Sequence, residues 1–373
     1  MSKSPRRGPT VGYYVLAPLL ASLVTLLLIE CGLAILRPVP FSIERNMYFE
    51  PDPYTGYRLR PHGMGHFQNG IPAVANSQGH RDDEVSVAKL TGVFRILVLG
   101  DSFTVGANVR QEEAYPQVLE RLLNQIALRP VEVVNTAVGG WDPFQYAQYY
   151  EHYARIFHPD LVYVGFFVGN DTYSQAERVE QRPTAVLGRR VSREAAVSRG
   201  TTVRVWLTEH SHLARLLLLR GPKQEFTHTR KTCDQFSEDY LAIQSSRMPN
   251  HLKRAPEREA AVQSSIRQIR RIQRMAQEDS SRLVVALLPD ENQVNPALQK
   301  LLVPVSQRDQ YDFRMPQAML AEMLGEMGIP TIDLLRDFQN DPRCLYMNDT
   351  HWTPEGHALA AKIIAEHLKS YLQ

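Results

Sequence analysis

The sequence predicts an α/β protein with a three-layer, doubly wound and mainly parallel sheet, preceded by one N-terminal transmembrane helix. Two observations predict this architecture. After residue 92, short apolar runs alternate with segments of helical spacing, and helices between apolar strands imply a parallel sheet that is covered on both faces. Before residue 37, a long and almost uncharged stretch has the length of a membrane span.

Residues 11–36 form the predicted anchor, because a helix of this length crosses a bilayer core of about 30 Å. A cleaved signal peptide is disfavoured, since its apolar part usually has only about 7–15 residues and ends at a small-x-small site that this stretch lacks. Lys3, Arg6 and Arg7 precede the span, so residues 1–10 are expected in the cytoplasm. The rest of the chain is then expected in the periplasm or outside the cell.

The apolar stretch also fits two alternative assignments. A buried core helix has the same composition, although few soluble domains begin with so long an apolar run. Cys31–Gly32 resembles a lipoprotein processing site, but Glu30 stands where a small residue is expected. A retained signal-anchor is the prediction.

Residues 37–92 are expected to lead from the membrane to the main domain in short strands and turns, because they are rich in Pro, Gly and polar residues. The main domain is expected over residues 93–373. Apolar residues recur at helical spacing between the first two predicted strands, before the fourth and near the C-terminus. The predicted strands are 95–99, 131–135, 161–167, 282–288 and 329–333.

An insertion is predicted at about residues 173–255, where the strand-helix rhythm stops and no clear strand is expected. Ten arginines lie between Arg178 and Arg230, and the stretch "SHLARLLLLR" reads as a short apolar helix with basic flanks. We expect a solvated cap over the sheet edge or a face turned to the membrane. The alternative is a surface that binds an anionic substrate or lipid headgroups.

The composition excludes several classes of protein. A net charge of +2, from 42 basic and 40 acidic residues, gives no case for a nucleic-acid-binding protein. Three cysteines are too few for a disulfide scaffold, and the sequence does not decide whether Cys233 and Cys344 pair. The sequence has neither a G-x-S-x-G elbow nor a phosphate-cradling loop, and no cofactor or metal is expected.

Polar residues follow the predicted strands where they end. Ser102 follows the first strand in "GDS", Gly140 the second, and Asn170 the third in "VGND"; Asp349 and His351 come from "NDTHW", before the last helix. Ligands of open α/β sheets bind outside the carboxyl ends of the strands. We therefore expect these five residues at one edge of the sheet.

These residue types suit acyl transfer. A serine hydroxyl becomes a nucleophile when a histidine takes its proton, and a carboxylate fixes the histidine tautomer. The tetrahedral intermediate needs preorganised N–H donors, which the backbone of Ser102 and Gly140 and the side-chain amide of Asn170 can supply. Ser102, His351 and Asp349 are thus the candidate catalytic residues, with Gly140 and Asn170 as the candidate oxyanion hole.

Four blocks together resemble the SGNH (GDSL-type) hydrolases, whose fold is flavodoxin-like. Gly100-Asp101-Ser102 resembles the nucleophile block, Gly140 the oxyanion glycine, Asn170 the oxyanion asparagine, and His351 the catalytic histidine, followed by "PEGH". The resemblance covers about residues 93–372 apart from the insertion. It implies an ester hydrolase that needs no cofactor or metal.

The sequence departs from the common pattern in three places, one of which is "VGND", where the commoner residue between Gly and Asn is missing. "GDSF" replaces GDSL, and Asn348 occupies the position three residues before the histidine, where many members have the triad acid. Asp349 lies two residues before His351, a spacing of branches that include polysaccharide O-acetyltransferases.

Simpler roles for the same residues remain open. Ser102 suits a helix N-cap with Asp101 in the turn, and Asp349 suits a cap of the last helix. A metal site would need Asp349, His351 and His357, without a further ligand. Trp352 is expected to pack in the core rather than contact substrate.

The leading hypothesis is a membrane-anchored serine ester hydrolase acting on a small molecule, a lipid or a glycan. One alternative is an O-acyltransferase that modifies an envelope glycan with the same site, served by a membrane acyl-donor protein. Another is a non-catalytic envelope protein that binds glycan or lipid. Substrate, acyl length, oligomeric state and the role of the insertion are not predictable from the sequence.

Overall fold

The computed structural model describes residues 11–36, 48–67, 69–172, 178–186, 188–196, 198–218 and 232–372. Contacts divide the chain into two compact units. The larger comprises residues Ser42–Ala196 and Glu225–Gln373, and the smaller comprises residues Met1–Phe41 and Val197–Gln224. The predicted cytoplasmic tail, residues 1–10, lies outside the described residues.

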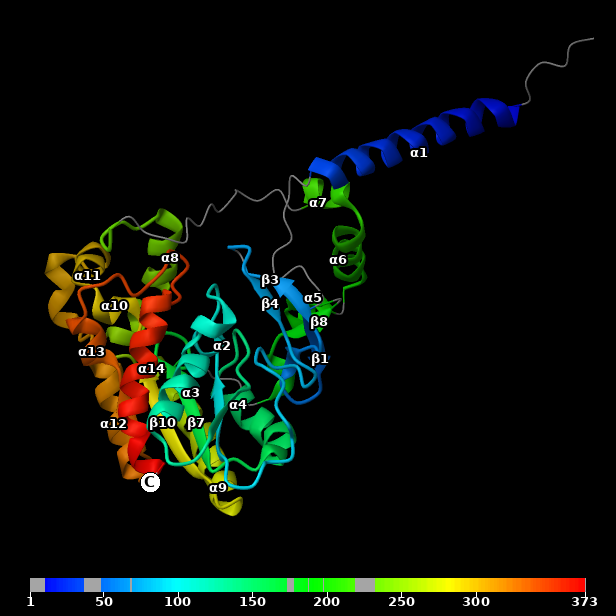
Figure 1. The fold of residues 1–373 in the computed structure, drawn as a ribbon. Coiled ribbons are helices and arrows are strands. Elements are labelled where there is room, and N and C mark those ends of the chain that lie inside the picture. The colour runs from blue at the N-terminus through cyan, green and yellow to red at the C-terminus, as the bar shows by residue number, and fades with distance from the viewer. Residues whose placement is uncertain are drawn as a thin grey trace, which may run out of the picture. The chain divides into compact units, whose positions relative to one another are not determined.

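A five-stranded parallel sheet forms the centre of the larger unit (Figure 1). Its order is β11-β10-β7-β5-β6, and each neighbouring pair is parallel. This confirms the predicted fold class. Three predicted strands coincide with observed ones, and the other two differ by one or two residues at their ends. The strands are β5 (Phe94–Gly100), β6 (Val131–Asn135), β7 (Leu161–Phe167), β10 (Arg282–Leu288) and β11 (Thr331–Asp333).

Helices cover both faces of this sheet. Successive side chains of a strand point to opposite faces, and on each face they pack with helices in a separate hydrophobic cluster. Leu97 and Leu99 of β5 pack in the first cluster, with helices α4, α9 and α12, whereas Ile96 and Val98 pack in the second, with α3, α13 and α14. These helices are α3 (Tyr115–Ile126), α4 (Pro143–Tyr149), α9 (Pro256–Glu278), α12 (Met315–Glu326), α13 (Leu335–Asn340) and α14 (Pro354–Leu368).

The described part of the segment before the sheet consists of two antiparallel hairpins, in agreement with the predicted short strands and turns. It shares the core of the larger unit, since Tyr57 and Leu59 are fully buried in the first cluster. The predicted domain boundary near residue 92 stays a prediction. The strands are β1 (Phe49–Asp52), β2 (Gly56–Leu59), β3 (Met64–His66) and β4 (Pro72–Val74).

The predicted insertion contributes to both units. Strands β8 and β9 and helices α5 and α8 belong to the larger unit, and helices α6 and α7 belong to the smaller one. The β8–β9 hairpin corrects the expectation that this region has no strand; its three-residue strands are too short to show an alternating pattern. The bounds are β8 (Thr184–Val186), β9 (Arg189–Val191), α5 (Arg193–Ala196), α6 (Arg199–His210), α7 (His212–Leu218) and α8 (Glu238–Arg247).

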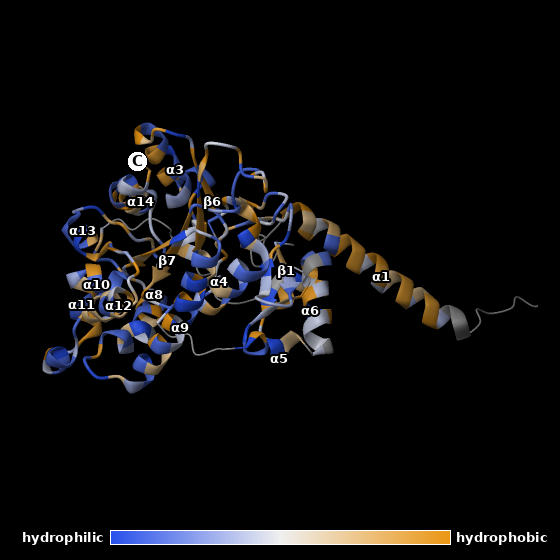
Figure 2. Ribbon diagram, turned by 90° about the horizontal axis from the view of Figure 1, so that it is seen from below, coloured by the Kyte–Doolittle hydropathy of each residue, from blue (hydrophilic) through white to orange (hydrophobic). Residues whose placement is uncertain are grey.

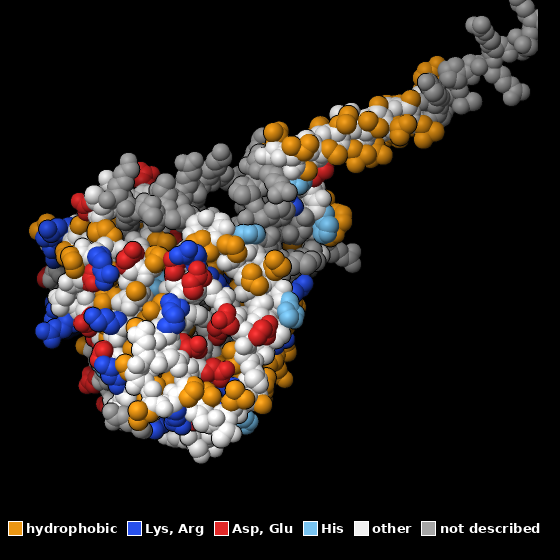
Figure 3. Space-filling model, in the orientation of Figure 1, with side chains coloured by type: hydrophobic (Ala, Val, Ile, Leu, Met, Phe, Trp, Pro, Cys, Tyr) orange, Lys and Arg blue, Asp and Glu red, His pale blue; other side chains and the backbone are white. Residues whose placement is uncertain are grey.

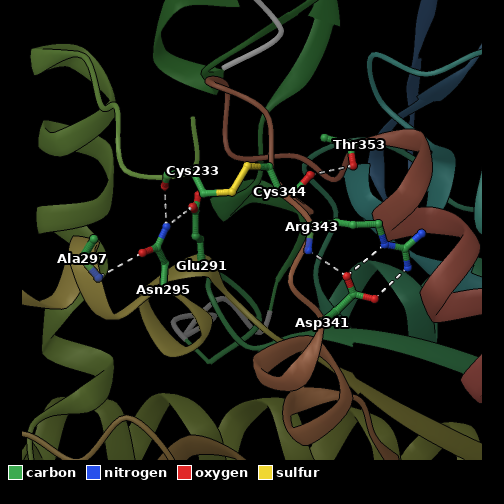
Figure 4. The surroundings of a disulfide bond; sticks show 8 residues. All are labelled: Cys233, Glu291, Asn295, Ala297, Asp341, Arg343, Cys344 and Thr353. Atoms are coloured by element: carbon green, nitrogen blue, oxygen red, sulfur yellow. Dashed lines mark hydrogen bonds and ion pairs between the residues drawn. A yellow bond between two sulfur atoms is a disulfide. The ribbon is translucent and has the colours of Figure 1, made fainter. Parts of the chain in front are cut away.

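Cys233 and Cys344 form a disulfide, with their Cα atoms 5.3 Å apart (Figure 4). The Asn295 side chain donates to the Cys233 carbonyl at 2.7 Å, and the Thr353 hydroxyl donates to the Cys344 carbonyl at 3.2 Å. The bond therefore joins the second half of the predicted insertion to the segment that leads to His351. Two further helices lie nearby, α10 (Glu291–Val294) and α11 (Pro296–Leu302).

Helix α1 (Val11–Leu36) is apolar along most of its length, with Glu30 as its one charged residue (Figures 2 and 3). Its residues Tyr14–Leu36 have a mean hydropathy of 2.5, and none of that window is buried. By length and composition the helix is long enough to cross a membrane. The predicted anchor thus forms one continuous helix over the expected residues.

Candidate active site

The two strands at the centre of the sheet carry the first candidate residues. The chain places β6 on one side of β5 and then β7, β10 and β11 on the other, so the strand order reverses between β5 and β7. Open α/β sheets bind ligands at such a switch point, outside the carboxyl ends of the strands. Ser102 follows β5 and Asn170 follows β7, so both lie at this point.

Ser102 is the first residue of the short helix α2 (Ser102–Val105). Asp101 is the N-cap of this helix, because its carboxylate accepts a hydrogen bond from the Phe103 amide at 2.9 Å. The alternative with Ser102 as the cap is therefore wrong. Gly100 permits the tight turn, since a Cβ there would overlap the Thr104 side chain.

Asn170 is oriented by the buried Asp101. The Asn170 amide nitrogen donates to Asp101 Oδ2 at 2.9 Å, which uses one of its two N–H groups. The second N–H is available for another acceptor. Burial raises the pKa of Asp101, although the Asn170 hydrogen bond opposes this.

The turn after β6 lies beside Ser102. A Cβ built on Gly139 would lie 3.8 Å from the Ser102 Cβ, an ordinary van der Waals distance. Gly140 has a φ of +77°, which disfavours any other residue. A Cβ at Gly140 would also overlap the guanidinium of Arg190. Gly140, the predicted oxyanion glycine, is thus the residue that follows Gly139, which lies beside Ser102.

His351 and Asp349 are hydrogen-bonded to each other. Asp349 Oδ2 lies 3.0 Å from His351 Nδ1, and Asp349 Oδ1 accepts the His351 amide at 3.2 Å. The ring of Phe103, the neighbour of Ser102, lies 5.2 Å from the His351 ring between centroids. The two-residue spacing therefore still lets the acid hold the histidine. Asp349 is not the cap of α14, because Thr353 occupies that position.

His357 and Trp352 are structural residues. The fully buried His357 accepts the Tyr115 amide through Nδ1 at 3.2 Å, and burial lowers its pKa to about 3. Among the residues that the structure describes, no group of three or more His, Cys, Asp or Glu side chains is arranged to hold a metal. Trp352 is fully buried and packs against Phe103 and Phe338, as expected.

Arg247 and Asn108 reach the histidine loop from distant parts of the sequence. Arg247, the last residue of α8, donates to Thr350 Oγ1 at 3.3 Å and to Asp290 at 3.1 Å. Thr350 separates Asp349 from His351 and has a φ of +79°, a strained backbone conformation for a β-branched residue. The Asn108 amide donates to Asp349. No local motif in the sequence could have linked these residues to the site.

Three carboxyl groups near the candidate site, those of Asp101, Asp142 and Asp171, interact electrostatically. Burial raises the pKa of Asp171 well above its usual range, and the charges of Asp101 and Asp142 raise it further. Asp171 accepts hydrogen bonds from the Phe167 amide and the Tyr146 hydroxyl. The folded protein therefore holds a proton on Asp171 at pH values where the unfolded chain has released it.

Replacing Asp171 with asparagine is expected to flatten the dependence of stability on pH. Because the folded pKa is raised, wild-type stability falls by up to about 1.4 kcal/mol per pH unit once the pH rises above 3.8, the ordinary value. The asparagine cannot ionise and can still accept the Phe167 amide. Melting temperatures between pH 5 and 8 test this, with the exposed Asp312→Asn as control. Equal slopes for wild type and Asp171→Asn would contradict the raised pKa.

Comparisons with known proteins find a family model that matches part of the chain, and several solved structures. Residues 248–373 match the SGNH hydrolase-like domain of the acetyltransferase AlgX, which includes Asp349 and His351 but not Ser102. No curated protein sequence matches the chain.

Among solved structures, an acetyl xylan esterase has 12% identity and a TM-score of 0.40, covering 74% of this chain and all of that one. TesA has 11% identity and a TM-score of 0.42, covering 75% and 99%. An acetylxylan esterase from Geobacillus stearothermophilus has 13% identity and a TM-score of 0.37, covering 74% and 94%.

Proposed function

We propose that the chain is a serine ester hydrolase whose nucleophile is Ser102, in agreement with the match of residues 248–373 to an SGNH hydrolase-like domain. One observation carries the proposal. At the switch point of the sheet, Ser102 begins a helix and lies beside Gly139, and its two neighbours contact the other candidate groups. Asp101 accepts the Asn170 amide, and the Phe103 ring lies 5.2 Å from the ring of His351, which is hydrogen-bonded to Asp349. Acyl transfer needs this set of groups.

In the proposed reaction His351 takes the proton of Ser102 while the serine oxygen attacks the ester carbonyl. Asp349 holds His351 Nδ1–H, which leaves Nε2 as the base and stabilises the imidazolium. The tetrahedral oxyanion accepts hydrogen bonds from the amides of Ser102 and Gly140 and from Asn170. His351 then protonates the leaving alcohol, and water, activated by the same histidine, releases the acid from the acyl-enzyme.

Transfer to a glycan hydroxyl is the second candidate. It is favoured by the match of residues 248–373 to the AlgX acetyltransferase domain and by the Asp349–His351 spacing. The first half-reaction is the same, and a sugar hydroxyl replaces water in the second. A membrane protein that supplies acyl groups would then be the donor.

Helix α1 is proposed to anchor the enzyme as a single-pass signal-anchor with the N-terminus in the cytoplasm and the catalytic domain outside it. Its length and apolar surface support a span, and the basic residues before it support this orientation. The Cys233–Cys344 disulfide also fits an oxidising compartment.

The full chain, purified in detergent, tests the proposed function. We expect it to hydrolyse p-nitrophenyl acetate and to form a covalent adduct with a fluorophosphonate probe on the peptide that contains Ser102. Adding an oligosaccharide acceptor separates the two candidates, because transfer yields an acetylated sugar and hydrolysis yields acetate. An intact, folded protein that neither turns over esters nor takes the probe would favour a non-catalytic binding protein.

A further inference from the structure

The smaller unit contains a helical hairpin that is attached to α1 at Glu30, in the second half of that helix. The Glu30 carboxylate accepts hydrogen bonds from the Ser211 hydroxyl at 2.8 Å and from the amides of His212 and Leu213 at the start of α7. Arg215 of α7, which is buried, donates to the Thr208 carbonyl of α6 at 2.6 Å. The hairpin α6–α7 is thus fixed to one level of α1.

The position of Glu30 along α1 indicates how deep in a membrane the attachment of the hairpin would lie. Val11 and Glu30 are separated by about 28 Å along a helix with a rise of 1.5 Å per residue, close to the thickness of a bilayer core. If α1 spans the membrane as proposed, Glu30 lies at its outer interface. The joint between α6 and α7 must then lie at the same interface, within reach of one side chain.

Apolar side chains of the hairpin are exposed close to this joint. On α6, Val203 and Trp206 are 56% and 51% exposed and lie one turn apart on one face. On α7, Leu217 and Leu218 are 58% and 39% exposed. His210 stacks on the Trp206 ring, with centroids 4.8 Å apart. Tryptophan is enriched at membrane interfaces because its ring is apolar and its N–H is polar.

We propose that the α6–α7 hairpin lies in the lipid interface next to α1, with Val203, Trp206 and Leu217 in contact with acyl chains. This rests on the membrane span of the proposed function. The hairpin then acts as a second, shallow attachment that restricts rotation and tilt of the anchor. A protein partner on the same face is the competing occupant.

Tryptophan fluorescence tests the hairpin directly, because the chain has three tryptophans and the other two, Trp141 and Trp352, are at most 1% exposed. The full chain is reconstituted in phosphatidylcholine vesicles with or without bromine on the acyl chains. We expect brominated lipid to quench up to about a third of the emission, since bromine quenches indoles on contact, and Trp206→Phe to abolish the quenching while ester turnover is unchanged.

The controls separate the two proposals. Release of the chain from the vesicles by alkaline carbonate would overturn the membrane span itself. If the chain remains in the membrane and Trp206 is not quenched, only the hairpin inference is wrong. Equal quenching of wild type and Trp206→Phe would also overturn it.

A different feature of the larger unit concerns the glycine turn at Ser102. The Gly139 carbonyl accepts hydrogen bonds from the Tyr57 hydroxyl at 2.9 Å and from Arg190 Nη1 at 3.4 Å. This carbonyl and the Gly140 N–H belong to one planar peptide group. Groups that hold the oxygen therefore also fix the direction of the N–H.

We infer that Tyr57 and Arg190 are positioning residues for the oxyanion hole, which rests on the proposed role of Gly140. Tyr57 is itself held, because its ring is buried and its carbonyl accepts the Trp141 indole N–H at 3.1 Å. A carbonyl that accepts two hydrogen bonds, one from a cation, also polarises the peptide and strengthens its N–H as a donor.

Tyr57→Phe is expected to lower kcat for p-nitrophenyl acetate about tenfold while KM changes less than twofold, since an oxyanion donor acts in the transition state. Tyr150→Phe is the matched control, because it removes a hydroxyl hydrogen bond to Asp279 next to the start of β10. Arg190→Met is expected to lower kcat in the same way and Arg190→Lys to restore part of it.

An unchanged kcat in Tyr57→Phe would overturn this inference while Ser102→Ala still tests the proposed function. If kcat of Tyr57→Phe falls in proportion to its melting temperature, and kcat of Tyr150→Phe falls in the same way, then Tyr57 has only a structural role. If the wild type turns over no ester, this inference fails together with the proposed function.

Discussion

Replacing Ser102 with alanine is expected to lower the turnover of p-nitrophenyl acetate by about 10⁴-fold or more, because the acyl-enzyme can no longer form. The His351→Ala variant should lose a similar factor, since the serine keeps its proton without the base. Initial rates of the purified full chain in detergent measure both, and Ser246→Ala, an exposed serine on α8, should match the wild type.

The double variant Ser102→Ala/His351→Ala sharpens the test. Residues that act as one catalytic unit are not additive, so the double loss should equal the larger single loss and not the product of the two. Additive losses would mean that Ser102 and His351 contribute separately, which contradicts a nucleophile and base acting on one proton. Circular dichroism of each variant checks that the fold is retained.

Breaking the Cys233–Cys344 bond is expected to destabilise the larger unit by roughly 5 kcal/mol. The bond closes a loop of 111 residues, and the entropy of the unfolded chain rises strongly when so long a loop opens. The Cys233→Ser/Cys344→Ser variant should therefore melt about 10 °C below the wild type. Turnover should fall as well, because Cys344 begins the segment that carries Asp349 and His351.

Cys31→Ser is the matched control, since Cys31 is the free cysteine of the described chain. The Cys31→Ser variant should have the same melting temperature as the wild type. Dithiothreitol should lower the melting temperature of both proteins by the same amount. If the Cys233→Ser/Cys344→Ser variant melts within about 2 °C of the wild type, the expected loss of stability is absent. The segment between the two cysteines would then keep residual structure in the unfolded chain even without the bond.

The sheet was predictable because its strands are buried on both faces and read as unbroken apolar runs, such as "LVYVGFF" for β7. The candidate residues were predictable because each directly follows a strand or precedes the last helix. The sequence also placed the acid at Asp349, where its hydrogen bond to His351 is now seen. Their catalytic roles stay predictions.

Contacts between distant segments were not predictable. Arg247 lies 103 positions before Thr350, and only folding of the insertion brings the two together. Tyr57 is one of 16 tyrosines, and nothing in its neighbours indicates a contact with the Gly139 carbonyl. The α6–α7 hairpin reads as part of a surface cap, because its attachment to Glu30 depends on a residue 181 positions before Ser211.

The disulfide also sets an order of events during biogenesis. If the domain is translocated as proposed, Cys233 reaches the oxidising compartment 111 residues ahead of Cys344, and its thiol stays unpaired while β10, β11 and their helices are still being translocated. The native pair can form only after translocation of the strands that complete one side of the sheet. A mixed disulfide between Cys233 and a thiol oxidase is resolved only when the Cys344 thiolate attacks it and the oxidase thiol leaves. The yield of active enzyme should therefore depend on oxidase activity in the host, with Cys344 as the resolving cysteine.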